Sequence, residues 1–496
     1  MPTDNRKMLS SGAVYLCSSI LTQLVNLLLI PLYTRNLSQE QFGQYDLIIS
    51  VQMLLSLMIT LGVHSGMVRF FNEFENKREL RNTALTFALL WGAVCIGIAW
   101  ILSPLVSPLV FDGAEGSGLY VPYVVMISVF SCLNLIYSSF YSMQFKALKS
   151  SAIQFAVVLS TLLFALYFFL SRDMGIVGIL TAQLFSNVLV FIVLFALNLG
   201  TYRLIIKRDP MRKMLGYGTG LLLGDISAWV LTLSDRFLIK GYLNLSSVAV
   251  YSIGYKIGML INPAFITPFM SVFTAFKFKA YKDEDGPEQI RRMFRIYNFA
   301  GWLCILGLTL FAHLAVRLVA TEEYSSAGTL VPLISFSYFL SGSLAFYSLG
   351  LHIANKMRIN YLISLLAALI NVACNIVLIP WLGIYGSALA TVISYAVTSA
   401  VFYHYGSKYY PLGLGIFYPY KYLAIYVPAY ALHAAFMRIE HSLLIEIALN
   451  VVLVAAFIAC SLIFKFVSIR ELTGDLLPAW KRKPNNLLME GAKSES

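Results

Sequence analysis

Charged side chains are scarce in this 496-residue chain. Asp, Glu, Lys and Arg together make up 12% of it, whereas hydrophobic residues make up 59%. Average soluble domains carry about 25% charged residues, so a water-soluble fold is excluded. Long runs without a charged side chain include residues 8–34, 82–111, 119–145, 150–171 and 174–202. Each of these is long enough to cross a hydrocarbon core of about 30 Å as a helix.

Motifs that would indicate catalysis or a cofactor are also missing. The six cysteines all lie inside apolar runs without a CxxC pair, so no disulfide framework and no metal site are expected. The chain has no GxxxxGK[S/T] phosphate loop, so we do not expect direct use of ATP. The predicted outer loops are short, and we recognise no catalytic arrangement of carboxylates or of Ser and His in them. We therefore expect a protein that is not an enzyme and has no cofactor.

Positive charge is distributed unevenly over the loops between the apolar runs. Most of the 36 Lys and Arg residues lie in every second loop, with dense groups at 69–81, 203–213 and 277–295. The intervening loops hold six: Arg35, Arg172, Arg236, Lys240, Arg317 and Arg438. Positive charge stays on the cytoplasmic side of an inserted membrane protein. The alternation predicts a multi-pass protein with both termini in the cytoplasm. It also accounts for most of the net charge of +12, so no nucleic-acid partner is expected.

The predicted fold class is an all-α polytopic membrane protein with fourteen transmembrane helices. The uncharged stretch 359–407 is too long for one span, and Pro380–Gly383 divides it because proline disrupts a helix and glycine permits a turn. The predicted helices are 10–34, 42–67, 83–108, 119–143, 150–171, 174–198, 214–236, 248–274, 296–320, 329–353, 359–380, 384–405, 420–438 and 443–465.

An internal repeat relates the two halves of the chain. Three segment pairs recur in the same order, at offsets of 206, 206 and 208 residues: Arg6–Leu9 with Arg212–Leu215, Phe42–Tyr45 with Val248–Tyr251, and Gly175–Gly178 with Gly383–Gly386. Each repeat holds six helices, so both halves have the same orientation. This pattern predicts two parallel lobes around a central cavity, a transporter architecture. The predicted parts are an N-lobe at 1–205, a C-lobe at 206–406, helices 13 and 14 within 407–466, and a cytoplasmic tail at 467–496.

Two hairpins carry a resemblance to a known family. The first combines Pro31–Arg35, Leu37–Ser38 and Phe42–Tyr45, and the second combines Asp235–Ile239 with Val250–Ile253. With the helix count and the repeat, they resemble the bacterial polysaccharide transporter family, the O-antigen-type oligosaccharide-lipid flippases. That family belongs to the multidrug/oligosaccharidyl-lipid/polysaccharide exporter superfamily.

The resemblance implies a function and a set of partners. The substrate would be an undecaprenyl-pyrophosphate-linked oligosaccharide, an O-antigen or exopolysaccharide repeat unit. It would cross the bacterial cytoplasmic (inner) membrane by alternating access, through a cavity flanked by helices 1, 2, 7 and 8. Expected partners are this lipid-linked oligosaccharide and the membrane lipids. A coupling ion, either H⁺ or Na⁺, and the glycan polymerase machinery are further candidates.

Polar side chains within or next to the predicted spans form the candidate substrate-binding site, because charge at membrane depth is costly and marks function. Asp225 and Lys256 are the sole charges within their runs. Cationic groups there suit a pyrophosphate, whose hydration they replace with charge-assisted hydrogen bonds. The candidate residues are Gln23, Asn26, Arg35, Asp46, His64, Arg69, Asp225, Asp235, Arg236 and Lys256.

Structural roles compete with this interpretation. Asp225 and Lys256 either line the cavity or neutralise each other as a pair between helices 7 and 8. Asp235 and Arg236 lie at the predicted outer end of helix 7, where charges can reach water. There they act either as a gate or as an interfacial anchor.

The remaining candidates have similar alternatives. Arg35 and Asp46 flank the first outer hairpin, where a role as a gate competes with a role as an interfacial anchor. Arg69 fits the cytoplasmic charge pattern better than the cavity. His64 lies near the end of a span, where a packing role competes with proton relay.

Three other functions stay open. A lipid II flippase of the same superfamily shares the plan with two additional helices, and a multidrug and toxin exporter resembles a twelve-helix plan. A membrane glycan polymerase or ligase is a different class, but such enzymes usually carry a large outer loop with catalytic polar residues. The local hairpin motifs favour the polysaccharide branch.

Overall fold

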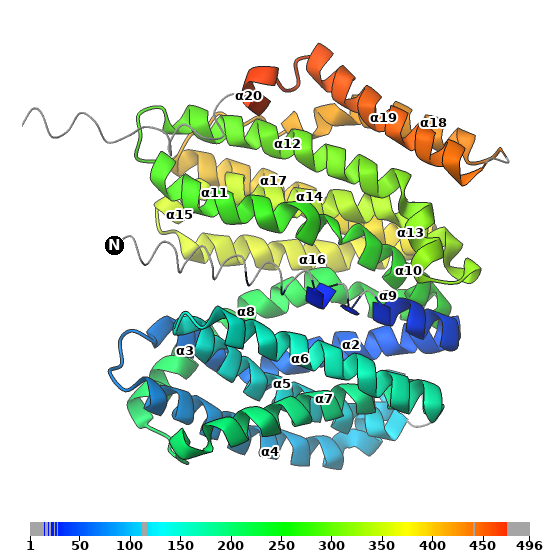
Figure 1. The fold of residues 1–496 in the computed structure, drawn as a ribbon. Helices are drawn as coiled ribbons and strands as arrows, with labels where there is room; N and C mark the ends of the chain where they lie inside the picture. The colour runs from blue at the N-terminus through cyan, green and yellow to red at the C-terminus, as the bar shows by residue number, and fades with distance from the viewer. Residues whose placement is uncertain are drawn as a thin grey trace, which may run out of the picture. The chain divides into compact units, whose positions relative to one another are not determined.

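The computed structural model describes residues 28–111, 117–439 and 442–473, together with Val14, Ser18, 21–23 and 25–26. All regular secondary structure in this part of the chain is helical (Figure 1). The helices form two compact units. The first unit comprises Met1–Tyr255, Leu314–Leu330 and Tyr361–Ser394, and the second comprises Lys256–His313, Val331–Asn360 and Tyr395–Ser496.

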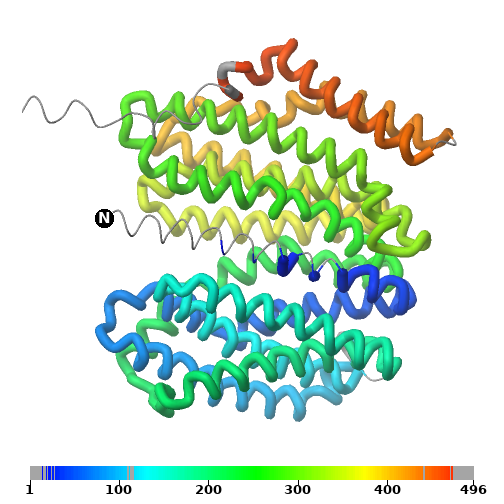
Figure 2. Tube along the Cα trace, in the orientation of Figure 1, coloured from blue at the N-terminus to red at the C-terminus, as the bar shows by residue number. Residues whose placement is uncertain are grey.

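The first unit contains helices α2 to α9 in full and most of α10. Helices α4 to α7 pack against one another, and α2 packs against α5 (Figure 2). The helices are α2 (Gln39–Thr60), α3 (Val63–Phe70), α4 (Lys77–Phe111), α5 (Tyr120–Met143), α6 (Ala147–Ala165), α7 (Gly175–Asn198), α8 (Arg208–Leu233), α9 (Asp235–Tyr242) and α10 (Leu245–Gly258), with shorter helical turns η1 (Ser117–Leu119), η2 (Leu166–Ser171), η3 (Leu199–Thr201) and η5 (Glu322–Leu330).

The second unit is built around aromatic side chains. Trp302 Nε1 donates to the Pro419 carbonyl at 2.7 Å, and the rings of Tyr297 and Phe339 stack 5.2 Å apart. Its helices are η4 (Asn262–Ile266), α11 (Thr267–Ala280), α12 (Gly286–Leu310), α14 (Val331–Tyr347), α15 (Leu349–Ile353), η6 (Tyr418–Tyr422), α18 (Leu423–Phe436), α19 (Leu443–Ile463) and α20 (Ile469–Thr473). Helices α13 (Ala312–Val319), α16 (Met357–Leu382) and α17 (Ile384–Tyr409), like α10, are divided between the two units.

The start of α2 and its break have local causes. Ser38 and Gln41 form a capping box, in which each side chain accepts a backbone N–H of the other residue. The predicted helix 42–67 is interrupted after Thr60, where Leu61 and Gly62 have φ values of 45° and 63°. Gly62 packs directly on Gly218 of α8, so a side chain there would overlap the backbone of Gly218. The break therefore allows α3 and α8 to approach closely.

The all-α polytopic class is confirmed. Twelve helices in the described ranges are long and apolar enough to cross a membrane. Of the fourteen predicted, helix 10–34 is described only in part, and 420–438 contains α18, a helix of 14 residues. The count of fourteen and the lobe boundaries at 205 and 406 stay predictions.

Candidate functional site

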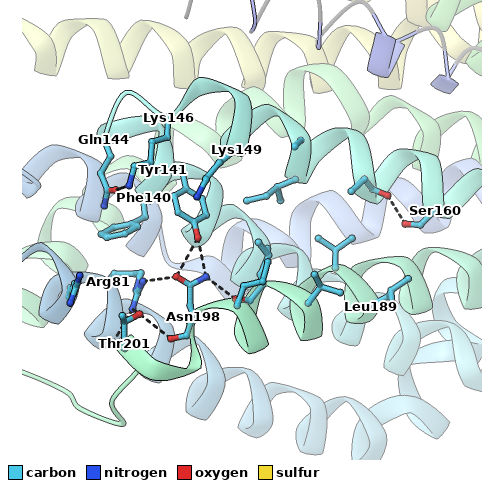
Figure 3. A pocket seen from close by; sticks show the side chains of 18 residues that line it. Arg81, Phe140, Tyr141, Gln144, Lys146, Lys149, Ser160, Leu189, Asn198 and Thr201 are labelled. Carbon is cyan, nitrogen blue, oxygen red and sulfur yellow. Dashed lines mark hydrogen bonds between the residues drawn. The ribbon is translucent and has the colours of Figure 1, made fainter.

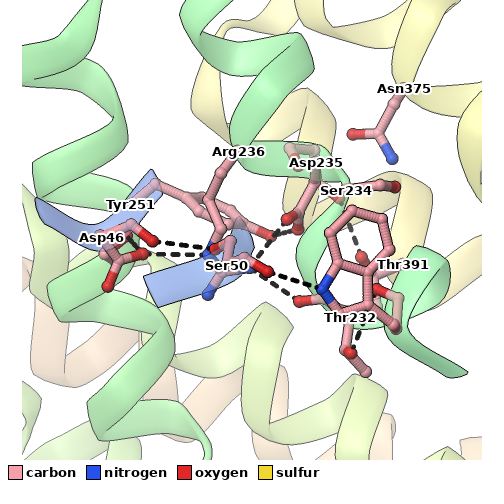
Figure 4. Close-up of polar contacts among 12 residues, drawn as sticks. Asp46, Ser50, Thr232, Ser234, Asp235, Arg236, Tyr251, Asn375 and Thr391 are labelled. Atoms are coloured by element: carbon pink, nitrogen blue, oxygen red, sulfur yellow. Dashed lines mark hydrogen bonds and ion pairs between the residues drawn. The ribbon is translucent and has the colours of Figure 1, made fainter. Parts of the chain in front are cut away.

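Arg236 is buried between two carboxylates in the first unit (Figure 4). Its Nε lies 3.1 Å from Asp46 Oδ2, and its Nη1 lies 2.8 Å from Asp235 Oδ1. The exposed fractions of Asp46, Asp235 and Arg236 are 5%, 0% and 3%. We call these three residues, together with Tyr251 and Ser252, the Arg236 cluster.

A break between two helices places Asp235 and Arg236 in this cluster. Helix α8 ends at Leu233, and α9 begins at Asp235. Arg236 Nη1 donates to the Thr232 carbonyl at 2.7 Å, one of the carbonyls at the end of α8. The expectation that Asp235 and Arg236 reach water at a helix end is wrong, because the chain continues as α9 to Tyr242 and both side chains are enclosed.

Helix α10 supplies a hydroxyl group to each carboxylate. Tyr251 Oη donates to Asp235 Oδ2 at 2.6 Å, and Ser252 Oγ donates to Asp46 Oδ2 at 2.5 Å. The guanidinium carbon of Arg236 lies 4.4 Å from the centre of the Tyr255 ring, which favours the cation further. One helix therefore contacts all three charges of the cluster.

The cluster holds one positive and two negative formal charges. Buried ions are expensive to desolvate, and removing one partner of such a pair typically costs about 3–5 kcal/mol because it strands the other charge. In this conformation Arg236 is engaged by protein carboxylates and does not present a free cation to a ligand. The cluster instead joins α2, α9 and α10 through charge-assisted hydrogen bonds.

The backbones of α2 and α10 also touch next to the cluster. A Cβ atom at Gly43 would overlap the carbonyl of Leu245 and crowd the backbone nitrogen of Ala249. Gly43 and Ala249 are 206 residues apart, as are Asp46 and Ser252. The two hairpins singled out in the sequence are thus in contact at positions that are equivalent in the repeat.

Another polar contact lies further along α8. Trp229 Nε1 donates to the Ser50 carbonyl at 2.9 Å and ties α8 to α2. Asp225 is exposed and interacts electrostatically with His64 on α3. His64 Nε2 also lies 3.1 Å from Ser65 Oγ. Asp225 and His64 thus lie near each other within the first unit.

The remaining predicted residues lie on α10, at the end of α3 and before α2. Lys256 is half-buried on α10, one helical turn beyond Ser252. Arg69 is exposed and pairs with Glu73 at 3.0 Å at the end of α3. Three further candidates are exposed on helical segments before α2: Gln23, Asn26 and Arg35.

A buried amide group was missed by the sequence analysis. Asn371 and Asn375 on α16 are both 0% exposed, and Asn375 Nδ2 donates to Asn371 Oδ1 at 3.1 Å. Asn371 Nδ2 donates to Thr391 Oγ1 on α17 at 3.3 Å. Figure 4 shows Asn375 and Thr391 among the residues drawn around Asp235. The i, i+4 spacing of two amides in an apolar run was the signal that could have identified them.

A family model and a relative match most of the chain. The model, described as "Polysaccharide biosynthesis protein", matches residues 8–278, more than half of the sequence. Protein 1 of the Lsg locus of Haemophilus influenzae is 22% identical over 419 residues, which cover 80% of this chain and 99% of the relative.

Solved structures share the fold. The lipid II flippase MurJ, in an inward closed conformation, aligns with a TM-score of 0.69 at 14% identity and covers 91% of this chain and 98% of MurJ. An inward-facing multidrug resistance transporter of the MATE family and MOP superfamily aligns with a TM-score of 0.61 at 15% identity, over 78% of this chain and 94% of the transporter. At these identities the likeness establishes the fold alone.

Proposed function

The chain belongs to the polysaccharide biosynthesis protein family, and we propose that it is a transporter of the MOP superfamily that translocates an undecaprenyl-pyrophosphate-linked oligosaccharide across the bacterial cytoplasmic membrane. It is a multi-pass membrane protein and not an enzyme. The proposed substrate has a large hydrophilic head, an anionic pyrophosphate and a polyprenyl tail. The head has to pass through the protein, while the tail stays in lipid.

The observation that carries the proposal is the contact between the two repeat-equivalent hairpins at the Arg236 cluster. A path for a bulky head needs a closure that is tight in one state and open in another. Charge-assisted hydrogen bonds suit this role because water or an anionic ligand can replace each partner when the helices separate. Asp46, Asp235 and Arg236 close α2 against α9 and α10 in this conformation.

We assign Arg236 a second role when this contact opens. Separation of α2 from α10 would break the hydrogen bond between Ser252 and Asp46 and expose the guanidinium of Arg236. Arginine matches phosphate geometry with a planar fork of donors, so the pyrophosphate would replace Asp46 as its partner. Lys256, one turn further along α10, would add a second cation to the same helix.

A second candidate is lipid II, the substrate named for MurJ, because MurJ aligns over 91% of this chain. The proposed binding of a pyrophosphate by Arg236 suits both substrates. The family model, described as a polysaccharide biosynthesis protein, favours the oligosaccharide branch. A multidrug exporter is favoured less, because the MATE structure aligns over 78% of the chain.

The proposal is tested in a strain of the source organism from which the gene has been deleted. We expect lipid-linked repeat units to accumulate at the inner leaflet and the surface glycan to disappear. Plasmid-borne wild type should restore the glycan, and a matched plasmid encoding MurJ should not. Normal surface glycan in the deletion strain, together with a block in peptidoglycan synthesis, would assign the chain to lipid II instead.

A further inference from the structure

A cavity of about 760 Å³ lies between α4, α5, α6 and α7, entirely within the first unit (Figure 3). One end is basic and polar, with four cationic side chains: Arg78, Arg81, Lys146 and Lys149. No carboxylate lines the cavity, and no ion pair joins any of these four cations to another described residue. The lining of the cavity therefore concentrates positive charge and includes no carboxylate.

Arg81 is fixed in place by neutral partners. Its guanidinium donates to Asn198 Oδ1 at 3.1 Å and to Thr201 Oγ1 at 3.1 Å, and it lies 4.9 Å from the centre of the Phe140 ring. The side chain of Arg81 is only 2% exposed. Amide and hydroxyl groups orient this cation but do not neutralise it, so an anion bound beside it would offset a buried charge that is otherwise costly.

The rest of the cavity is apolar and follows the helices toward the other side of the membrane. Lys149, Ile153 and Ala156 line it at helical spacing along α6. On α7, Leu197, Val193 and Leu189 line it at intervals of four, and their exposed fractions are 77%, 49% and 45%. These two stripes run away from the basic end on adjacent helices. They form the apolar part of the cavity, an apolar groove, and the exposed side chains on α7 leave it open at the protein surface.

We propose that this cavity is a binding site for an anionic phospholipid of the cytoplasmic leaflet. The phosphate contacts Arg81, Lys146 and Lys149, and one acyl chain lies between α6 and α7. The predicted topology places this end of α4 and α6 in the cytoplasm, where basic pockets between transmembrane helices meet anionic head groups. Inorganic phosphate would leave the apolar groove unused, whereas a lipid occupies both ends.

The site is distinct from the Arg236 cluster. Asp46 lies near the start of α2, whereas Arg78 and Arg81 lie near the start of α4, after the chain has passed through α2 and α3. The two sites are therefore separated by the length of a span, and the proposal does not depend on which substrate is translocated.

The test uses the full chain, purified in detergent and stripped of lipid. Phosphatidylglycerol vesicles or micelles should raise its melting temperature, and native mass spectrometry should show retained phosphatidylglycerol. The variant Lys146→Gln/Lys149→Gln should weaken this binding at least about tenfold, since each lysine near an anionic lipid contributes about 1 kcal/mol. The matched control Lys279→Gln/Lys282→Gln removes two exposed lysines outside the cavity and should bind as wild type does.

A second variant tests the groove and does not alter the charges. Val193→Trp replaces a half-exposed residue and fills the path of the acyl chain, so it should also weaken phosphatidylglycerol binding. Equal binding in Lys146→Gln/Lys149→Gln and in the control would overturn the proposal. Stabilisation by inorganic phosphate to the same extent as by phosphatidylglycerol, or binding of undecaprenyl phosphate but not of phosphatidylglycerol, would also overturn it.

Discussion

Ser252 Oγ donates a 2.5 Å hydrogen bond to Asp46, the residue 206 positions earlier and its equivalent in the internal repeat. An axis that relates two parallel repeats brings equivalent residues together only where they lie close to it. This contact therefore marks the point where α2 and α10 meet near the predicted axis. Arg236 contacts the same Asp46 oxygen, which places a buried charge at that meeting point.

Arg236→Ala should destabilise the protein by about 3–5 kcal/mol, because it removes the cation that pairs with the buried carboxylates of Asp46 and Asp235. Thermal unfolding in detergent measures the change. The triple variant Asp46→Asn/Asp235→Asn/Arg236→Gln should recover most of the stability but not transport. Arg172→Ala, an exposed control, should unfold like wild type. A stable Arg236→Ala protein would show that the buried charges do not depend on one another.

Gly43→Ala should reduce both export and stability, since its methyl group would meet the carbonyl of Leu245. Overpacking of this kind costs about 1–3 kcal/mol. Gly97→Ala is the matched control, because nothing lies within 4 Å of a Cβ at that position. Surface glycan and melting temperature are the measurements. Equal behaviour of the two variants would mean that the α2–α10 contact has no role in the transport cycle.

Lys256→Ala should abolish surface glycan while the protein still inserts into the membrane, and Lys256→Arg should retain part of the export. This follows from a role for positive charge on α10 in holding the pyrophosphate. Immunoblots of membranes and glycan staining separate the two effects. If Lys256→Ala does not fold and the double variant Asp225→Ala/Lys256→Ala does, then Asp225 and Lys256 form a structural pair. Normal export by Lys256→Ala excludes the substrate role.

Much of the fold was predictable from the sequence, because apolar runs and loop charges are set by the membrane. The range 119–143 nearly coincides with α5, Tyr120–Met143. The sequence could not show where α2 breaks, since the break lies at a contact between Gly62 and Gly218, which is far along the chain. It also assigned Arg81 to the loop charges, whereas Asn198 and Thr201 enclose it on α4.

The site was predicted in part. Asp46, Asp235 and Arg236 were chosen as polar residues near membrane depth, and the structure brings them together. Their pairing depends on contacts between α2, α9 and α10, which spacing along one helix does not reveal. Asn371 and Asn375 were missed because they lie in the predicted helix 359–380, which is not among helices 1, 2, 7 and 8 that the resemblance places around the cavity.

The central claim is that the α2 and α10 hairpins must separate for the lipid-linked oligosaccharide to cross. Cysteines at Gln39 and Leu245, in a background without the six native cysteines, place a crosslink across this contact. Gln39 lies one turn before Gly43 on α2, and Gly43 meets Leu245. Cysteine pairs placed within a few residues of these two positions are tested in the same way.

The decisive measurement is translocation of a lipid-linked oligosaccharide by the purified double-cysteine protein in proteoliposomes, followed by a lectin that detects sugar on the opposite face. We predict that the crosslinked protein shows no translocation, that reduction restores it, and that each single-cysteine protein is active throughout. Full translocation with the two hairpins quantitatively crosslinked would contradict the account.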